Sequence, residues 1–89
     1  DALEQYVSAS KMEKDKSKLS YIYHNIGVLF HRDKDYKQAI EAYKKALINN
    51  PKDGETRYNL SLAQKLLKDE QDNNENNQKE NKNNDSNNR

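Results

Sequence analysis

The feature that most constrains this chain is a regular spacing of large and small residues between Ser20 and Asp53. Two amphipathic helical patterns lie there, joined by a polar turn at residues 33–35, and Asn50-Pro51 ends the second pattern. The spaced positions are Tyr23, Ile26, Gly27, Phe30, Ala39, Tyr43, Ala46 and Pro51. The small residues let two helix backbones approach, and the large ones fill the space between them. The spacing therefore predicts a helix-turn-helix pair whose helices cross closely.

This spacing resembles the signature of the tetratricopeptide (TPR) repeat at every position that the signature names. Tyr23 and Ile26 stand where Trp and Leu are usual. The resemblance extends over roughly residues 2–69. It implies an all-α solenoid fragment of about four helices, whose function is protein–protein interaction.

The N-terminal residues repeat the second half of this pattern. The run Ala2-Leu3-Glu4 matches Ala39-Ile40-Glu41, so we interpret residues 1–13 as the second helix of a preceding repeat. The first helix of that repeat is missing, and we therefore expect that the chain was cut from a longer one. Residues 20–53 then form one complete repeat.

The pattern returns only in part after Gly54. Asn59, Leu60 and Ser61 occupy the positions equivalent to Asn25, Ile26 and Gly27 one repeat earlier. The pattern of a second helix does not follow, so we predict a single capping helix over residues 54–71. Half of the residues in 72–89 are asparagine, and none is aliphatic or aromatic. Such a segment cannot offset the entropy of ordering, so we expect a disordered tail. Its interspersed charges favour a soluble tail over a prion-like tract.

Local residues also predict where the helices begin. Ser17 is a candidate N-cap for a helix that runs from residue 18 to residue 32. Asp35, with Gln38 three residues later, matches a capping box for a helix that ends near Ile48. Asp53 precedes the last helix.

Composition excludes several classes of protein. Sixteen basic and fifteen acidic residues give a net charge of +1, which leaves no long-range field to concentrate nucleic acid. The chain has no cysteine for a thiolate metal site, and it has no apolar run of membrane-spanning length or signal peptide. We therefore expect no nucleic-acid partner and no direct membrane insertion.

The residue patterns also argue against metal binding and catalysis. His24 and His31 are seven residues apart, whereas zinc-binding helical pairs use a spacing of four. A calcium loop that starts at Asp33 fails because Gln38 and Lys44 occupy the positions of its glycine and its last carboxylate. No nucleophile elbow or phosphate-binding loop is found. The prediction is a protein that is not an enzyme and needs no metal or cofactor.

The resemblance to TPR stacks implies a concave groove lined by the first helix of each pair. The side chains expected to face it are Tyr21, His24, Asn25, Val28, His31, Arg32, Tyr58, Asn59, Leu62 and Lys65. Asn25 and Asn59 are one repeat apart, and two neighbouring amides suit the backbone of an extended peptide. The alternative is that these residues are ordinary solvated or helix-end positions.

In some members of the family the groove forms a carboxylate clamp that binds the C-termini of chaperones. Asn25 or Asn59 fits the amide position of this clamp, but His24, Val28 and Glu55 differ from the residues that it uses. The run from Tyr58 to Lys68, together with the Asn-rich tail, resembles the TPR proteins of the bacterial aerotolerance (Bat) operon. That resemblance implies a scaffold beside MoxR-type ATPases and von Willebrand-type proteins at the cell envelope or in the periplasm. The cytoplasm is the alternative compartment.

Two other functions stay open on the sequence. The unpaired N-terminal helix is a candidate for docking on missing upstream repeats or on a second copy, which makes the chain a structural or self-association module. A helical-repeat RNA binder is the less favoured reading, because of the small net charge.

Overall fold

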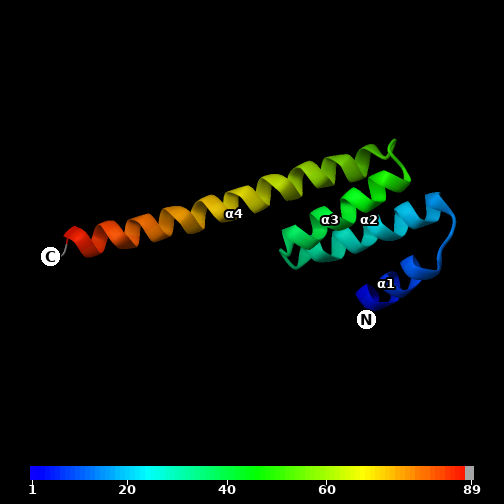
Figure 1. The fold of residues 1–89 in the computed structure, drawn as a ribbon, viewed down its shortest axis with the longest axis horizontal. Helices are drawn as coiled ribbons and strands as arrows, with labels where there is room; N and C mark the ends of the chain where they lie inside the picture. The colour runs from blue at the N-terminus through cyan, green and yellow to red at the C-terminus, as the bar shows by residue number, and fades with distance from the viewer. Residues whose placement is uncertain (88–89) are drawn as a thin grey trace.

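A computed structural model of the chain contains four α-helices and describes the backbone of residues 1–87 and the side chains of residues 1–74. The helices are α1 (Ala2–Met12), α2 (Lys16–Arg32), α3 (Tyr36–Asn49) and α4 (Gly54–Asn87). Consecutive helices pack against each other, and the C-terminal half of α4 extends beyond the other three (Figure 1). No strand occurs in residues 1–87. The prediction of an all-α fragment with about four helices is confirmed.

The packing of α2 on α3 is built around Gly27 and Tyr43. Tyr43 is 1% exposed, and its ring lies directly over the backbone of Gly27. Ala39 and Ala46 are fully buried on the same face of α3. Because Gly27, Ala39 and Ala46 carry no side chain larger than a methyl group, the two helices approach closely enough to enclose an aromatic side chain.

The helix α4 covers the other side of this core. Ala63 is fully buried and joins Ala39, Ile40 and Tyr43 in one apolar cluster. Partly buried side chains complete the cluster: Val28, Phe30, Leu60 and Leu67. Val28 was expected in the groove, and its place against the core shows that this turn of α2 contributes to packing.

An aspartate side chain caps the start of each of the four helices. Asp15 caps α2, since its Oδ1 accepts a hydrogen bond from the Lys18 backbone N–H at 3.1 Å. The prediction that Ser17 is this cap was wrong, because Asp15 is an equally good cap and allows α2 to begin two residues earlier. Asp35 caps α3 as predicted and accepts from the Gln38 N–H at 3.3 Å.

The turn between α2 and α3 has a backbone conformation that favours glycine. Lys34 has a φ of 61°, and its N–H donates to the His31 carbonyl at 3.0 Å. The Asp35 N–H donates to the Phe30 carbonyl at 2.9 Å, which completes a Schellman motif. These bonds fix the angle at which α3 returns along α2.

The last helix, α4, starts at Gly54 and continues to Asn87. The division into a capping helix over 54–71 and a disordered tail over 72–89 stays a prediction. The chain has no glycine or proline after Gly54, and asparagine costs less than about 0.7 kcal/mol per helical position, so nothing local ends the helix. All side chains in residues 68–74 are exposed, so this part of α4 is not held by burial. Residues 88 and 89 lie outside the described part of the chain.

Within the described residues, no helix is both long enough and apolar enough to cross a membrane.

The contact between Gly27 and Tyr43 leads to a first prediction. A Cβ at position 27 would overlap ring atoms Cδ1 and Cε1 of Tyr43 and lie 3.0 Å from Cζ, so Gly27→Ala should destabilise the fold by about 1–3 kcal/mol despite the better helix propensity of alanine. The matched control is Gly54→Ala, because nothing lies within 4 Å of the position of its Cβ. Urea unfolding should show a loss for Gly27→Ala alone. Equal effects of the two changes would contradict close packing at this crossing.

A second prediction concerns the C-terminal extension of α4. Deletion of residues 73–89 should change the free energy of unfolding by less than about 0.5 kcal/mol, because the side chains that precede it are already exposed. The deleted segment contains no aliphatic or aromatic residue, so its removal takes no apolar side chain from the core. A clear fall in the melting temperature on deletion would show that the segment packs on the repeat.

Candidate functional site

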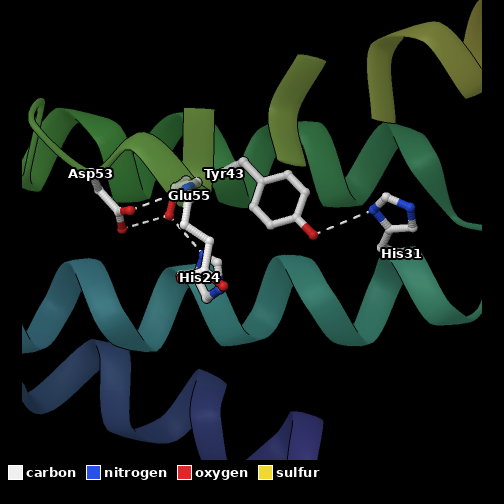
Figure 2. Close-up of polar contacts among 6 residues, drawn as sticks. His24, His31, Tyr43, Asp53 and Glu55 are labelled. Carbon is white, nitrogen blue, oxygen red and sulfur yellow. Dashed lines mark hydrogen bonds and ion pairs between the residues drawn. The ribbon is translucent and has the colours of Figure 1, made fainter. Parts of the chain in front are cut away.

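A buried hydroxyl joins α4 to α2. Thr56 is 0% exposed, and its Oγ1 donates a hydrogen bond to Asp53 Oδ2 at 2.6 Å. The same Oγ1 lies 2.7 Å from Nδ1 of His24 (Figure 2). Since the single hydroxyl proton is directed to the carboxylate, Oγ1 must accept from His24, and Nδ1 of the imidazole therefore carries a proton. This leaves Nε2 of His24 as the free ring nitrogen.

Asp53 both begins α4 and anchors this chain of hydrogen bonds. Its Oδ1 accepts from the Thr56 backbone N–H at 3.1 Å, while Oδ2 accepts from the Thr56 hydroxyl. The hydrogen bond from the hydroxyl is the main reason why the pKa of Asp53 is lower than that of an ordinary aspartate. Partial burial opposes the shift, and the backbone N–H of Thr56 and the nearby charge of His24 add to it.

The Nε2 atom of His24 faces a second carboxylate. Glu55 Oε1 lies 3.9 Å from it, and the Glu55 side chain is 80% exposed. The ring of His24 also lies against Tyr43, with centroids 6.0 Å apart and planes tilted by 46°. The residue that fills the core therefore also orients the histidine.

The second histidine of α2 has different partners. His31 Nδ1 is 3.4 Å from the Tyr43 hydroxyl (Figure 2). The ring of His31 also packs edge-on against Tyr36 at 5.5 Å. Burial raises the pKa of the Tyr43 hydroxyl. His24 and His31 therefore share contact with Tyr43 but have different hydrogen-bond partners. Among the described residues, no group of three or more His, Cys, Asp or Glu side chains is arranged to hold a metal.

Another buried hydroxyl supports the first turns of α2. Ser20 is 2% exposed, and its Oγ donates to the carbonyl of Ala46 at 2.8 Å. The same carbonyl accepts from the backbone N–H of Asn50 at 2.9 Å. The hydrogen bond from Ser20 therefore holds the first turns of α2 against the end of α3.

These elements enclose a polar cavity of about 390 Å³ at the junction of α2, the α3–α4 loop and the start of α4. Its lining residues are Ser17, Ser20, Tyr21, His24, Asn25, Asn50, Asp53 and Glu55. Three of them, Tyr21, His24 and Asn25, were expected in the groove. The Nδ2 atom of Asn25 is buried and has no hydrogen-bond partner. A buried amide donor without a partner is costly, and a half-turn of the amide would bring this donor to the cavity side in place of the oxygen.

The other expected groove residues lie outside this cavity. Arg32, Tyr58 and Lys65 are exposed, whereas Asn59 and Leu62 are half-buried on α4. His31 is held by Tyr43, and Val28 by the core. Among the described contacts no hydrogen bond joins Asn25 to Asn59. The pairing of these two amides on a ligand stays a prediction.

The sequence analysis did not assign a role in the site to Asp53, Thr56 or Ser20. A signal for the first two exists in the sequence, because Asp53 precedes Thr56 by three residues, the spacing at which a cap oxygen reaches a helical N–H. The link to His24 joins positions 32 residues apart and has no such local signal.

A second cavity, of about 340 Å³, lies among α1, α2 and α3. Its lining is more apolar and includes Val7, Tyr23, Ile26 and Phe30. The side chain of Lys45 lies over the Tyr23 ring, with Nζ 5.7 Å from the centroid.

Comparison with known proteins agrees with the class of protein that the fold defines. Residues 20–53 match the family model of the tetratricopeptide repeat, so the pair α2–α3 is a repeat of this family. Such repeats generally mediate protein–protein interaction. The recognition of a TPR repeat from the sequence is confirmed.

Among curated proteins, the chain is similar to photosystem I assembly protein Ycf3. It is 36% identical to the protein of Rippkaea orientalis over 52 residues, 38% to that of Cyanophora paradoxa over 52, and 37% to that of Sorghum bicolor over 51. These alignments cover 57–58% of the chain and 30% of each relative. The chain therefore spans less than a third of the length of these relatives. No solved structure matches it.

A third prediction follows from Asp53. Asp53→Asn should lower the free energy of unfolding by about 1–2 kcal/mol at pH 7, because it replaces a charged acceptor of the Thr56 hydroxyl. The pKa of Asp53 is lower in the folded chain than its usual 3.8, so the unfolded chain binds the proton more readily. The advantage of the wild type should therefore be complete above that value and disappear as pH falls through the lower folded pKa. Unfolding at several pH values tests this, and a constant difference down to pH 2 would contradict it.

Proposed function

We propose that this chain is a protein-interaction module that binds an extended segment of a partner protein between α2 and the start of α4. The observation that carries the proposal is the cavity of about 390 Å³ whose lining includes Asn25, a residue with an unpaired amide donor. An amide whose buried end has no partner in the free protein is suited to the backbone of a bound segment, which offers donors and acceptors in turn.

Exposed aromatic side chains also favour a binding role for this region. Tyr21 lines the cavity and is 65% exposed, and Tyr58 on α4 is 68% exposed. Tyrosine offers a large, flat contact area and loses little conformational freedom on binding. The expected groove residues Asn59, Leu62 and Lys65 continue along α4, and we propose that they contact the rest of the segment.

The relatives suggest the kind of process in which such a module acts. They are named as photosystem I assembly proteins, which supports a role for this chain in the assembly of other proteins. The resemblance of residues 58–68 to the Bat operon TPR proteins supports a more specific role, as a scaffold for a cell-envelope ATPase and a von Willebrand-type protein. Both are forms of the same proposal, since each requires a partner segment in the groove.

Self-association through α1 is the second candidate. The helix α1 has no buried residue, and Met12 at its end is 82% exposed. The exposed Met12 and half-buried apolar side chains such as Val7 offer a surface that a second copy or an upstream helix would use. A molecular mass that rises with concentration, and falls on Met12→Ser, would favour this candidate.

A peptide selection tests the groove directly. A random displayed-peptide library is selected on the purified chain, and the enriched peptides are titrated against the wild type, Asn25→Ala, Asn59→Ala and Lys44→Ala. Each lost hydrogen bond is worth about 0.5–1.5 kcal/mol, so the two asparagine changes should weaken binding by roughly two- to tenfold. Lys44→Ala, on the exposed face of α3, should leave the affinity unchanged.

The stability of a matched variant separates binding from folding. Asn25→Leu keeps the approximate shape of the side chain and removes the unpaired Nδ2, so it should not lower the melting temperature. Loss of affinity with unchanged stability identifies Asn25 as a binding residue. Peptides that bind the Asn25→Ala, Asn59→Ala double mutant as tightly as the wild type would refute the groove.

A further inference from the structure

The lining of the polar cavity is rich in hydrogen-bond acceptors and has no basic residue other than a histidine. Of the eight lining residues, Asp53 and Glu55 carry carboxylates, and none is lysine or arginine. This contrasts with the chain as a whole, whose 16 basic and 15 acidic residues nearly balance. The cavity is therefore locally negative on a protein that has almost no net charge.

The positions of the two carboxylates define this character. Glu55 Oε1 lies 3.9 Å from Nε2 of His24, the ring nitrogen that does not contact Thr56. The pKa of Asp53 is lowered, so its carboxylate is also charged at neutral pH.

We propose that the cavity takes the side chain of a lysine or arginine from the partner segment, which rests on the proposed function of this groove. The cationic nitrogen lies against the carboxylate of Glu55, within the field of Asp53. A backbone carbonyl of the segment accepts from Asn25 after a half-turn of the amide, which exchanges its nitrogen and oxygen.

The neighbouring aromatic ring suits the same occupant. Tyr21 lines the cavity and is exposed, so the aliphatic stem of lysine or the guanidinium plane of arginine can cover its face. A negative side chain in this position would meet two carboxylates and no compensating cation among the lining residues. The cavity thus distinguishes partners mainly by charge.

Two peptide libraries of the same design test this inference, one with all residues and one without lysine and arginine. We expect binders from the complete library to carry Lys or Arg, and their affinity to fall about 1.5- to fivefold with Glu55→Gln, the range of an exposed ion pair. The matched control is Glu41→Gln, a carboxylate on α3 that is 64% exposed and does not line this cavity. Glu55→Lys should lower the affinity further.

The outcomes separate this inference from the proposed function. The library without Lys and Arg could yield peptides that bind with equal affinity and depend on Asn25. This result would refute the proposed cationic side chain in the cavity but leave the proposed groove intact. Binders from the complete library that are indifferent to Glu55→Gln would also refute the cationic side chain. Failure of both libraries to yield any binder that depends on Asn25 would refute the groove itself. A Glu55→Gln effect that grows weaker at high salt, with none for Glu41→Gln, supports the inference.

Discussion

The close contact between Gly27 and the ring of Tyr43 is the constraint on which the rest of the structure depends. It sets the distance between α2 and α3, and the same ring then reaches both histidines of α2. His24 packs on its face at 6.0 Å, and His31 accepts or donates at its hydroxyl, 3.4 Å away. A side chain at position 27 would displace the ring, and both histidines would lose the surface that orients them. The core and the site are therefore not independent parts of this small fold.

The second requirement is the polar link from α4 to α2. Most of the burial of α4 is against α3, through Ala63, Leu60 and Leu67. The hydroxyl of Thr56 adds the connection to His24, and because it is fully buried it would be costly without partners. With Asp53 on one side and His24 on the other, its donor and one acceptor position are both used. This arrangement holds the start of α4 beside α2, and the cavity lies at that junction.

The sequence predicted those features that depend on local spacing. The helix-turn-helix repeat over residues 20–53, the cap at Asp35 and the start of α4 after Asp53 all follow from residues within a few turns of one another. The site was predicted less fully, because repeat geometry indicates which helix faces the groove but not which side chains turn inward. Val28 contributes to the core, and His24 is engaged by a threonine 32 positions away. Such a contact depends on the tertiary packing of α2, α3 and α4, and no local sequence pattern predicts it.

The balance of charges determines how a negative cavity on a nearly neutral chain can act. Charges in 0.1 M salt are screened beyond about 10 Å, and a net charge of +1 adds no field at longer range. Asp53 and Glu55 can therefore attract a cation only once a partner segment is already close. Their effect should appear in how long a bound segment stays rather than in how quickly it arrives, since steering of association requires an extended potential. The aromatic and amide groups, Tyr21 and Asn25, supply contacts to any extended segment, and the carboxylates then distinguish among segments by the charge of one side chain.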